Sequence, residues 1–400
     1  MMKKIKFLAS SLLLLTVQGA VDAQQINVPK AFAHAAAQTT VMLQEIAKAA
    51  DPAKPELVSP RTLDNGKLKL VATRDWTSGF FPGVLWYLDE YYQTEQWKLA
   101  ARKFTAYMEK EKTNGTTHDM GFKVFCSVGN AFRLTNDQHD KEVIIQSAKT
   151  LATRFNPKTG VILSWDHSRD KWVNPVIIDN MMNLELLFEA TKLTGDSSFY
   201  KIAVSHANTT MKNHFREDYS SYHVVDYDPQ TGAVLKKTTH QGYSNSSAWA
   251  RGQAWGLYGY TMCYRYTKNP AYLKQAENIA KFIFNNPNMP KDLVPYWDFD
   301  APQIPNEPRD ASAAAVIASS LYELSKYSKQ GKDYYQKANR ILNSLSTQYI
   351  ASAGTAKGFI LLHSTGSKPS NSEVDVPLSY GDYYYLEALL RYKNYKTKTY

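Results

Sequence analysis

The sequence predicts an all-α fold, an (α/α)6 barrel built from six helical hairpins. Three observations lead to this expectation. Apolar residues recur with helical spacing along almost the whole chain. The helical runs come in pairs that are separated by short polar breaks. The first run of each pair is apolar almost all round, as a buried inner helix would be, and the second is amphipathic, as an outer helix would be.

Five helix–break–helix segments follow one another along the chain. They cover residues 83–111, 121–155, 180–215, 253–286 and 311–345. A last helical run, residues 380–395, has no partner after it, and the amphipathic segment at about 29–49 supplies that partner if the helices close into a ring. Because no linker interrupts the series, we expect residues 24–400 to form a single catalytic domain.

Residues 1–23 have the composition of a secretory signal peptide. Lys3, Lys4 and Lys6 form a basic start, an apolar run follows, and the small residues around Asp22 suit a cleavage site ending at Ala23. The apolar run is too short to span a bilayer comfortably, and no cysteine follows it to carry a lipid. We therefore expect a periplasmic or secreted protein without a membrane anchor, and the oligomeric state stays open.

The charge and the aromatic content indicate the class of ligand. The formal charge is +10, and loss of three lysines and one aspartate with the leader leaves +8. A basic secreted protein favours anionic partners, and no Lys/Arg block or nucleic-acid motif appears, so an acidic sugar fits better than nucleic acid. The 27 Tyr, 16 Phe and 8 Trp suit a cleft that stacks on sugar rings, although a large helical core also uses tyrosine.

Several kinds of chemistry lack their motifs. No HExxH, Cys-x-x-Cys or EF-hand pattern occurs, so a metal site has little support in the sequence. A Ser-His-Asp hydrolase is a poor match because no G-x-S-x-G elbow is present. Cys126 and Cys263 lie in apolar helical runs and are expected to be buried, and the sequence leaves open whether they pair.

Polar residues gather just ahead of the inner helices. Inner helices of such a ring run parallel, so their N-termini meet at one mouth, where the positive helix ends favour an anion. Helix capping alone would also place aspartates at these points. We nevertheless expect one cavity to be ringed by these residues, namely Asp75, Asp119, Asp179, Arg251, Asp310 and Asp382, with Trp76 and Trp255.

Asp179 is the one acid ahead of the apolar run in NPVIIDNMMNLELLFEA. It is either an N-cap or a titrating group whose apolar surroundings raise its pKa towards use as a general acid. Asp119 stands one inner helix earlier, and neighbouring helix axes lie roughly 8–10 Å apart. The two carboxyls can therefore face each other across a sugar-sized gap, as in glycoside hydrolysis. Further proton-handling or hydrogen-bonding candidates are His118, His223, His240 and Gln241.

Six ordered motifs resemble those of the unsaturated glucuronyl hydrolases of glycoside hydrolase family 88. They are WTSGFFPGVLW, HDMGF, IIDNMMNLELLFEATKLTGD, YHVVDYDPQTG, THQGYSNSSAWARGQAWGLYGY and DASAAAVIASSLYEL. The resemblance runs from about residue 30 to the C-terminus. It implies an (α/α)6 barrel of the six-hairpin glycosidase type that acts without a metal or organic cofactor. It also implies a substrate left by polysaccharide lyases, an oligosaccharide with a 4,5-unsaturated uronic acid at its non-reducing end.

The resemblance implies a role for each matching residue. Asp179 protonates C4 of the vinyl ether and then, as a base, activates the water that attacks C5. The resulting hemiketal opens and expels the remaining sugar. Asp119 holds substrate hydroxyls and influences Asp179. The implied substrate contacts are Trp76, Trp165, His223, His240, Gln241, Arg251 and Trp255.

The segment HSTGSKPSNS, residues 363–372, bears on the identity of the second sugar. Ser364, Ser367 and Lys368 resemble the sulfate-binding segment of family members that act on glycosaminoglycans. An ordinary polar surface loop is the alternative, and His240 stands where those members often have an arginine, which argues against a strongly sulfated substrate. We expect activity on unsaturated disaccharides from heparin, chondroitin or hyaluronan.

Two other functions stay open at this stage. An unsaturated rhamnogalacturonyl hydrolase is a related barrel that acts on pectin fragments, but its segment usually reads closer to RGNGW, whereas this chain has RGQAW. A non-catalytic binding protein for acidic sugars would belong to a different class. The presence of both Asp119 and Asp179 argues against it.

Overall fold

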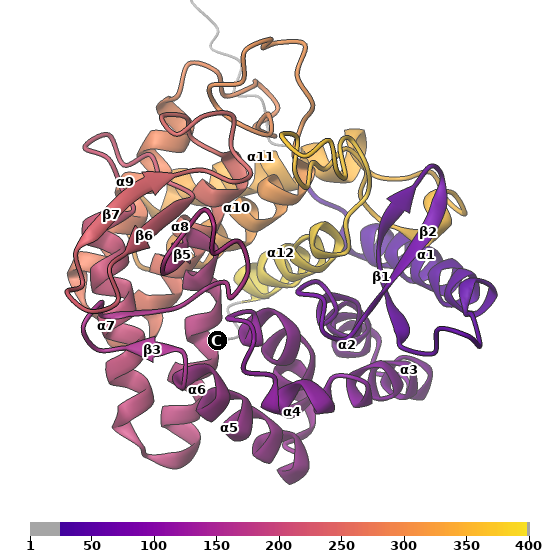
Figure 1. The fold of residues 1–400 in the computed structure, drawn as a ribbon. Coiled ribbons are helices and arrows are strands. Elements are labelled where there is room, and N and C mark those ends of the chain that lie inside the picture. The colour runs from indigo at the N-terminus through magenta and orange to yellow at the C-terminus, as the bar shows by residue number, and fades with distance from the viewer. Residues whose placement is uncertain (1–24, 398–400) are drawn as a thin grey trace, which may run out of the picture.

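The computed structural model describes residues 25–397. The predicted signal peptide, residues 1–23, therefore lies outside the described residues. Within them, helices form two concentric layers, and short strands are added at three places (Figure 1).

Six helical stretches form the inner layer. Each packs against the next along the chain, and the last also packs against the first, so the ring is closed as the sequence predicts (Figure 1). The six stretches are α2 (Phe80–Tyr92), η2 with α4 (Gly121–Gly129, Asn130–Thr135), η3 with α6 (Ile178–Asn183, Leu184–Thr194), α8 (Ala250–Thr267), α10 (Ala311–Leu324) and α12 (Ser379–Thr397).

A second helix follows each of the first five inner stretches on the outside. The outer helix next to α12 comes from the start of the chain, because α1 packs against α2, α12 and the 3-10 turn η4 (Ala356–Gly358). This arrangement matches the predicted closure of the ring. The outer helices are α1 (Val28–Ala49), α3 (Glu95–Ala106), α5 (Gln138–Ala152), α7 (Ser197–Asn213), α9 (Pro270–Asn285) and α11 (Gly331–Gln348).

At the predicted breaks one helix ends and the next begins, and both ends have common capping residues. Asn136 and Gly195 take left-handed backbone angles just after α4 and α6, which stops each helix. The side chains of Asp137, Asp196 and Asn269 then accept backbone N–H groups and cap the outer helices that follow. The burial pattern agrees, since every residue of inner α10 is buried, whereas outer α11 buries one face.

Short strands are added to the predicted helical fold in three small sheets. Strands β1 (Leu57–Asp64) and β2 (Lys67–Ala72) form a hairpin whose turn, Asn65–Gly66, has positive φ at both residues. A second antiparallel sheet contains β5 (Pro175–Ile177), β6 (Val224–Tyr227) and β7 (Val234–Thr238), and a two-residue pair joins β3 (Phe155–Asn156) to β4 (Val161–Ile162). Because β5 leads directly into η3, the second sheet borders the mouth at which the inner helices begin.

Two further sequence questions have structural answers. Cys126 in η2 and Cys263 in α8 are both buried and both free, so they do not form a disulfide. Within residues 25–397, no helix combines the length and the apolar character that crossing a bilayer would need.

Candidate active site

A cleft of about 290 Å³ opens where the inner helices begin. Its walls combine carboxylates, imidazoles, indoles and serines, and most of the predicted substrate contacts are among them. The lining residues are Arg61, Trp76, His118, Asp119, Trp165, His167, Ile177, Asp179, His240, Gln241, Arg251, Ser367, Ser370 and Ser372. The structure therefore brings Asp119 and Asp179 into one cavity, as the spacing of their helices predicts.

Asp179 lies in η3, a 3-10 turn between β5 and α6, and its residue surface is 7% exposed. Burial is the largest influence on its carboxyl and raises the pKa to about 7, with a smaller upward effect from Asp119. Arg251 and, more weakly, Trp255 lower the pKa, although the indole N–H of Trp255 makes no hydrogen bond of ordinary geometry. Asp179 can thus hold a proton near neutral pH, as a general acid must.

His223 is oriented towards Asp179 by its backbone neighbours. Its Nδ1 accepts the N–H groups of His240 and Gln241, each at 3.1 Å. Burial keeps the pKa of His223 well below its ordinary value, so the ring is neutral and carries its proton on Nε2. Nε2 lies 3.7 Å from Oδ2 of Asp179, and neither atom has a hydrogen-bond partner among the described residues. An unpaired donor beside an unpaired acceptor forms a site for a water or a substrate hydroxyl.

Thr117 holds Asp119 by donating its hydroxyl to Oδ2 at 2.8 Å. Nε2 of His118 lies 3.3 Å from Oδ1 but makes no hydrogen bond among the described residues, because the neutral ring carries its proton on Nδ1, which donates to the carbonyl of Ser164. The carbonyl of Asp119 accepts the first hydrogen bond of η2, a stretch of π-helix. Such stretches frequently occur at functional sites.

A glycine at the start of η2 allows a close approach to the neighbouring inner stretch. A Cβ on Gly121 would lie 2.6 Å from Cα of Asn183 at the end of η3. The side chain of Asn183 also accepts the N–H of Phe122 at 3.0 Å. This contact fixes the segment after Asp119 against the segment after Asp179, and so sets the two carboxyls relative to each other.

Aromatic rings form two sides of the cleft. Trp76 contacts Phe122 and Tyr380 on one side. Trp165 lies on the other side, with the imidazoles of His167 and His240 at 5.3 and 5.4 Å between ring centroids. Burial lowers the pKa of His240, so its ring is uncharged near neutral pH. The two indoles are placed as the sequence predicts for stacking on sugar rings.

Arg251 and Gln241 hold the loop that carries the serines. Arg251 donates to Asp310 at 2.7 Å and to the carbonyls of Thr365 and Gly366 at 2.5 and 2.6 Å. Gln241 also donates to the carbonyl of Gly366, at 2.9 Å. Both side chains line the cleft, so they position its wall in addition to any contact with substrate.

Some predicted residues lie away from the cleft. Ser364 is fully buried and pairs through its backbone with Val376, and Lys368 lines a neighbouring hollow of about 330 Å³. Trp255 is fully buried beside Asp179 and is not part of the cleft wall. Asp382 was expected to ring the cavity, and this expectation is wrong. It sits within the first turn of α12, and its carboxylate accepts backbone N–H groups from Ile360 and Leu361.

Arg61 is a cleft residue that the sequence analysis missed. It comes from β1, and its guanidinium pairs with Asp75 at 2.7 Å and Glu373 at 2.5 Å. The alternating apolar pattern on both sides of Asn65–Gly66 is a signal for the hairpin itself. No local pattern shows that this hairpin reaches the cleft.

No group of three or more His, Cys, Asp or Glu side chains within residues 25–397 is arranged to hold a metal ion. What the cleft offers is a carboxyl with a raised pKa, a second aspartate side chain and hydrogen-bonding groups between two indoles. This set can donate a proton, take one from water and hold a sugar ring.

Residues 56–398 match the family model described as Glycosyl Hydrolase Family 88. The chain belongs to glycoside hydrolase family 88. Among curated members of this family, an unsaturated glucuronyl hydrolase of Formosa agariphila is 54% identical over 326 residues, which are 81% of each chain. An unsaturated chondroitin disaccharide hydrolase of Streptococcus pneumoniae is 34% identical, with 85% of this chain and 87% of the relative aligned.

Solved structures of family 88 enzymes share the fold. An unsaturated glucuronyl hydrolase specific for heparin superposes with a TM-score of 0.87 at 47% identity, covering 92% of this chain and 98% of that chain. A mutant of the Streptococcus agalactiae enzyme, complexed with dGlcA-GalNAc6S, superposes with a TM-score of 0.77 at 32% identity, covering 92% of both. The (α/α)6 barrel predicted from the sequence is thereby confirmed.

Proposed function

We propose that this family 88 chain removes the 4,5-unsaturated uronic acid from the non-reducing end of lyase-generated oligosaccharides. One observation carries the proposal. Burial raises the pKa of Asp179 to about 7, Oδ2 of that carboxyl has no hydrogen-bond partner among the described residues, and Asp179 lines a cleft that also holds Asp119. The activities named for the relatives support the same reaction.

In the proposed reaction Asp179 begins as the acid. Its proton adds to C4 of the C4=C5 double bond, and the positive charge that develops at C5 is shared with the ring oxygen. Water then bonds to C5 and returns a proton to the Asp179 carboxylate, which restores the starting state. A pKa of about 7 suits both steps, because neither protonation state is strongly favoured near neutral pH.

His223 is the residue placed to orient the attacking water. Its Nε2 lies 3.7 Å from Oδ2 of Asp179, and neither atom has a hydrogen-bond partner among the described residues, so both can bond to the same water oxygen. Asp119 accepts a substrate hydroxyl and holds the ring against Trp76 or Trp165. The hydrated product is a hemiketal at C5. Its ring opens to a ketone at C5, which leaves the ring oxygen as a hydroxyl of a hemiacetal at C1. This hemiacetal collapses to an aldehyde, and the second sugar leaves with the glycosidic oxygen, now protonated, still attached.

The substrate we propose is an unsaturated glycosaminoglycan disaccharide of the heparin or chondroitin type. The relatives include an enzyme specific for heparin and three named as chondroitin disaccharide hydrolases. Ser367, Ser370 and Ser372 at the cleft are hydroxyls that can bind a polar group of the second sugar. We also propose that the chain is exported to the periplasm or secreted, on the strength of its N-terminal sequence.

The activity is tested by the loss of the ultraviolet absorbance of the unsaturated uronate. Lyase-generated disaccharides from heparin, chondroitin, hyaluronan and rhamnogalacturonan form the panel. We expect turnover of at least one glycosaminoglycan disaccharide. Turnover of the rhamnogalacturonan disaccharide alone would refute the substrate class, and binding without turnover of any disaccharide would refute the enzymatic proposal.

The route of the reaction is tested with heavy-oxygen water. Hydration at C5 leaves the glycosidic oxygen on the released sugar, so that oxygen carries no label. Label in the corresponding hydroxyl of the released sugar would show that water had attacked the second sugar and broken the bond between its carbon and the glycosidic oxygen. Label introduced directly at C1 of the uronate would show ordinary glycosidic cleavage.

A further inference from the structure

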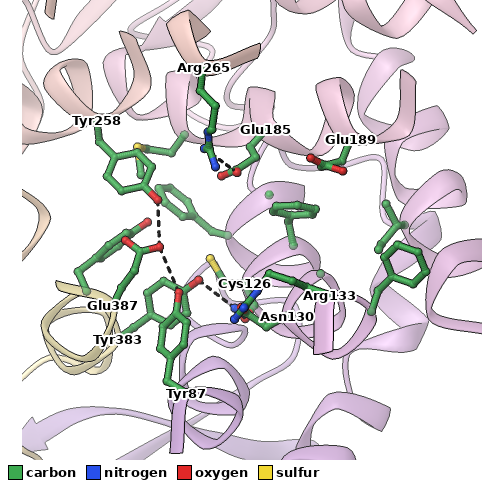
Figure 2. Close-up of a pocket in the computed structure, with 18 of the residues that line it drawn as sticks. Tyr87, Cys126, Asn130, Arg133, Glu185, Glu189, Tyr258, Arg265, Tyr383 and Glu387 are labelled. Atoms are coloured by element: carbon green, nitrogen blue, oxygen red, sulfur yellow. Dashed lines mark hydrogen bonds and ion pairs between the residues drawn. The ribbon is translucent and has the colours of Figure 1, made fainter. Parts of the chain in front are cut away.

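A cavity larger than the catalytic cleft lies at the opposite end of the barrel from it. It measures about 510 Å³, against about 290 Å³ for the cleft, and later turns of the inner helices line it (Figure 2). A volume of this size is typical of small-molecule sites. The ring of Phe122 lines this far cavity and contacts both Trp255 and Trp76. Aromatic side chains thus separate the two cavities.

The charged groups of the far cavity are paired. Four carboxylates and four cations line it, each of these carboxylates has a cation as partner, and Glu323 adds a fifth carboxylate 3.1 Å from both Arg265 and Arg391. The pairs are Glu90–Arg133 at 2.6 Å, Glu185–Arg265 at 2.8 Å, Glu189–Lys192 at 2.8 Å and Glu387–Arg391 at 3.4 Å. The cavity therefore offers many hydrogen-bond donors and acceptors, and because its cations are all paired it does not favour an anionic ligand.

Its carboxylates already bind hydroxyl groups of the protein. Glu387 accepts the phenol groups of Tyr87 and Tyr258 at 3.1 and 3.0 Å, as Figure 2 shows, together with the hydroxyl of Ser319. Carboxylates in this setting form charge-assisted hydrogen bonds with O–H donors. A ligand rich in hydroxyls would make the same kind of contact.

Two further carboxylates, those of Glu185 and Glu189, use only one of their two oxygens in hydrogen bonds with the described residues. The hydrogen bonds of Glu185 with Arg265 and Tyr266 all go to Oε1. Those of Glu189 with Lys192 and Tyr266 also go to Oε1. Among the described residues, Oε2 of each therefore has no hydrogen bond, although both residues line the cavity. These oxygens are available to hydroxyl donors of a ligand.

Flat apolar surfaces lie beside these polar groups. The rings of Phe125, Tyr258, Tyr266 and Tyr383 contribute to the lining. A sugar without charge presents hydroxyls around its edge and an apolar face of C–H groups, which matches paired charges next to aromatic rings. We propose that the far cavity is a second binding site that takes a neutral mono- or disaccharide.

Calorimetric titration of the full chain with lactose and with N-acetylglucosamine tests the proposal. We expect one of them to bind. Glu189→Gln, which removes the charge of a partly exposed acceptor, should weaken that binding about tenfold, the usual effect of losing a hydrogen bond to a charged group. Tyr266→Phe, a second cavity variant, should weaken it as well. Trp165→Ala in the catalytic cleft and Glu217→Gln on the exposed surface should leave it unchanged.

Two results would overturn the second site. One is the absence of binding by either sugar. The other is binding that Trp165→Ala abolishes and Glu189→Gln leaves intact, which would place the sugar in the cleft. Turnover of the unsaturated disaccharide by Glu189→Gln should equal that of the wild type. This measurement shows that the variant is folded, and it keeps the test separate from that of the proposed hydrolase activity.

Discussion

Asp179 and Asp382 belong to two regions of the same barrel mouth and share several properties. Each lies at the start of an inner helical stretch, each is buried, and burial raises the pKa of each to about 7. Their oxygens differ. Both oxygens of Asp382 accept backbone N–H groups, from Ile360 at 3.0 Å and Leu361 at 2.8 Å, whereas Oδ2 of Asp179 has no hydrogen-bond partner among the described residues and its residue lines the cleft.

This difference separates a structural carboxyl from a candidate catalytic one. A raised pKa identifies a carboxyl that is removed from water, and this is true of both residues. Catalysis also requires an oxygen that a substrate can reach, and only Asp179 of the two lines the cleft. The pKa is therefore a useful guide only together with the hydrogen-bond partners of the group.

The largest effect should come from Asp179→Asn. The amide cannot supply the proton, so we expect kcat to fall by about 10²–10⁴-fold, the usual contribution of acid–base catalysis. The melting temperature should stay close to that of the wild type, because the substitution removes no hydrogen bond of Oδ2. Initial rates and thermal unfolding of the same preparation measure both. Turnover near the wild-type rate would show that Asp179, like Asp382, has no catalytic role.

Asp119→Asn should have the next largest effect. Loss of a charged acceptor for substrate hydroxyls should lower kcat/KM by about 10–100-fold. The negative charge of Asp119 helps to raise the pKa of Asp179, so the variant should also move the alkaline limb of the pH–rate profile to lower pH. If the rate fell but the alkaline limb of the pH–rate profile stayed at the same pH, the carboxyls of Asp119 and Asp179 would act independently.

Asp382→Asn should change stability and leave catalysis nearly intact. An amide has one acceptor oxygen for two backbone N–H groups, so unfolding should become easier by about 1–3 kcal/mol. The wild-type carboxyl binds its proton more tightly when folded, with a pKa near 7 against 3.8. Its contribution to stability is therefore present below about pH 4 and lost as pH rises through about 7.

Melting temperatures measured across that pH range test this account. The decline between about pH 4 and 7 should be shallower in Asp382→Asn than in the wild type. If fully folded Asp382→Asn lost as much kcat as Asp179→Asn does, the result would show that Asp382 influences the cleft.

The smallest effects are expected in the serine loop, where two consecutive residues differ in the same way. Ser367 lines the cleft, whereas Lys368 lines the neighbouring hollow with Tyr243 and Trp297. For a sulfated disaccharide, Ser367→Ala should raise KM about threefold or more, the effect of losing one hydrogen bond. Lys368→Ala should change KM less than Ser367→Ala does. A selective rise in KM for the sulfated sugar in Lys368→Ala would show that the lysine reaches the substrate.

The ring of helices could be predicted because its signal is local. Helical periodicity, polar breaks and the alternation of all-apolar with amphipathic runs are each contained within one hairpin, and together they specify the barrel. The raised pKa of Asp179 was predictable for the same reason, since the apolar residues around it are its sequence neighbours. The order of the motifs along the chain then indicated the family.

The rest of the site depends on contacts between distant segments. Arg61 and Glu373 are 312 positions apart, and only the folded hairpin β1–β2 brings them together at the cleft. Asp382 points away from the cleft because the chain at Ile360 and Leu361 returns beside α12 and donates its backbone N–H groups to the carboxylate. The positions of Ser364 and Lys368 depend on how Arg251 holds their loop. Periodicity cannot report such contacts.

The central claim is that Asp179 acts from its protonated state, and the pH dependence of kcat/KM tests it most directly. With an unsaturated glycosaminoglycan disaccharide as substrate, rates measured between about pH 5 and 9 should fall as pH rises through about 7, because the acid is then lost. The same alkaline limb should persist in Asp382→Asn, whose carboxyl with a similar pKa is absent. Rates that stay level from about pH 6 to 9, or a limb that disappears in Asp382→Asn, would contradict the account.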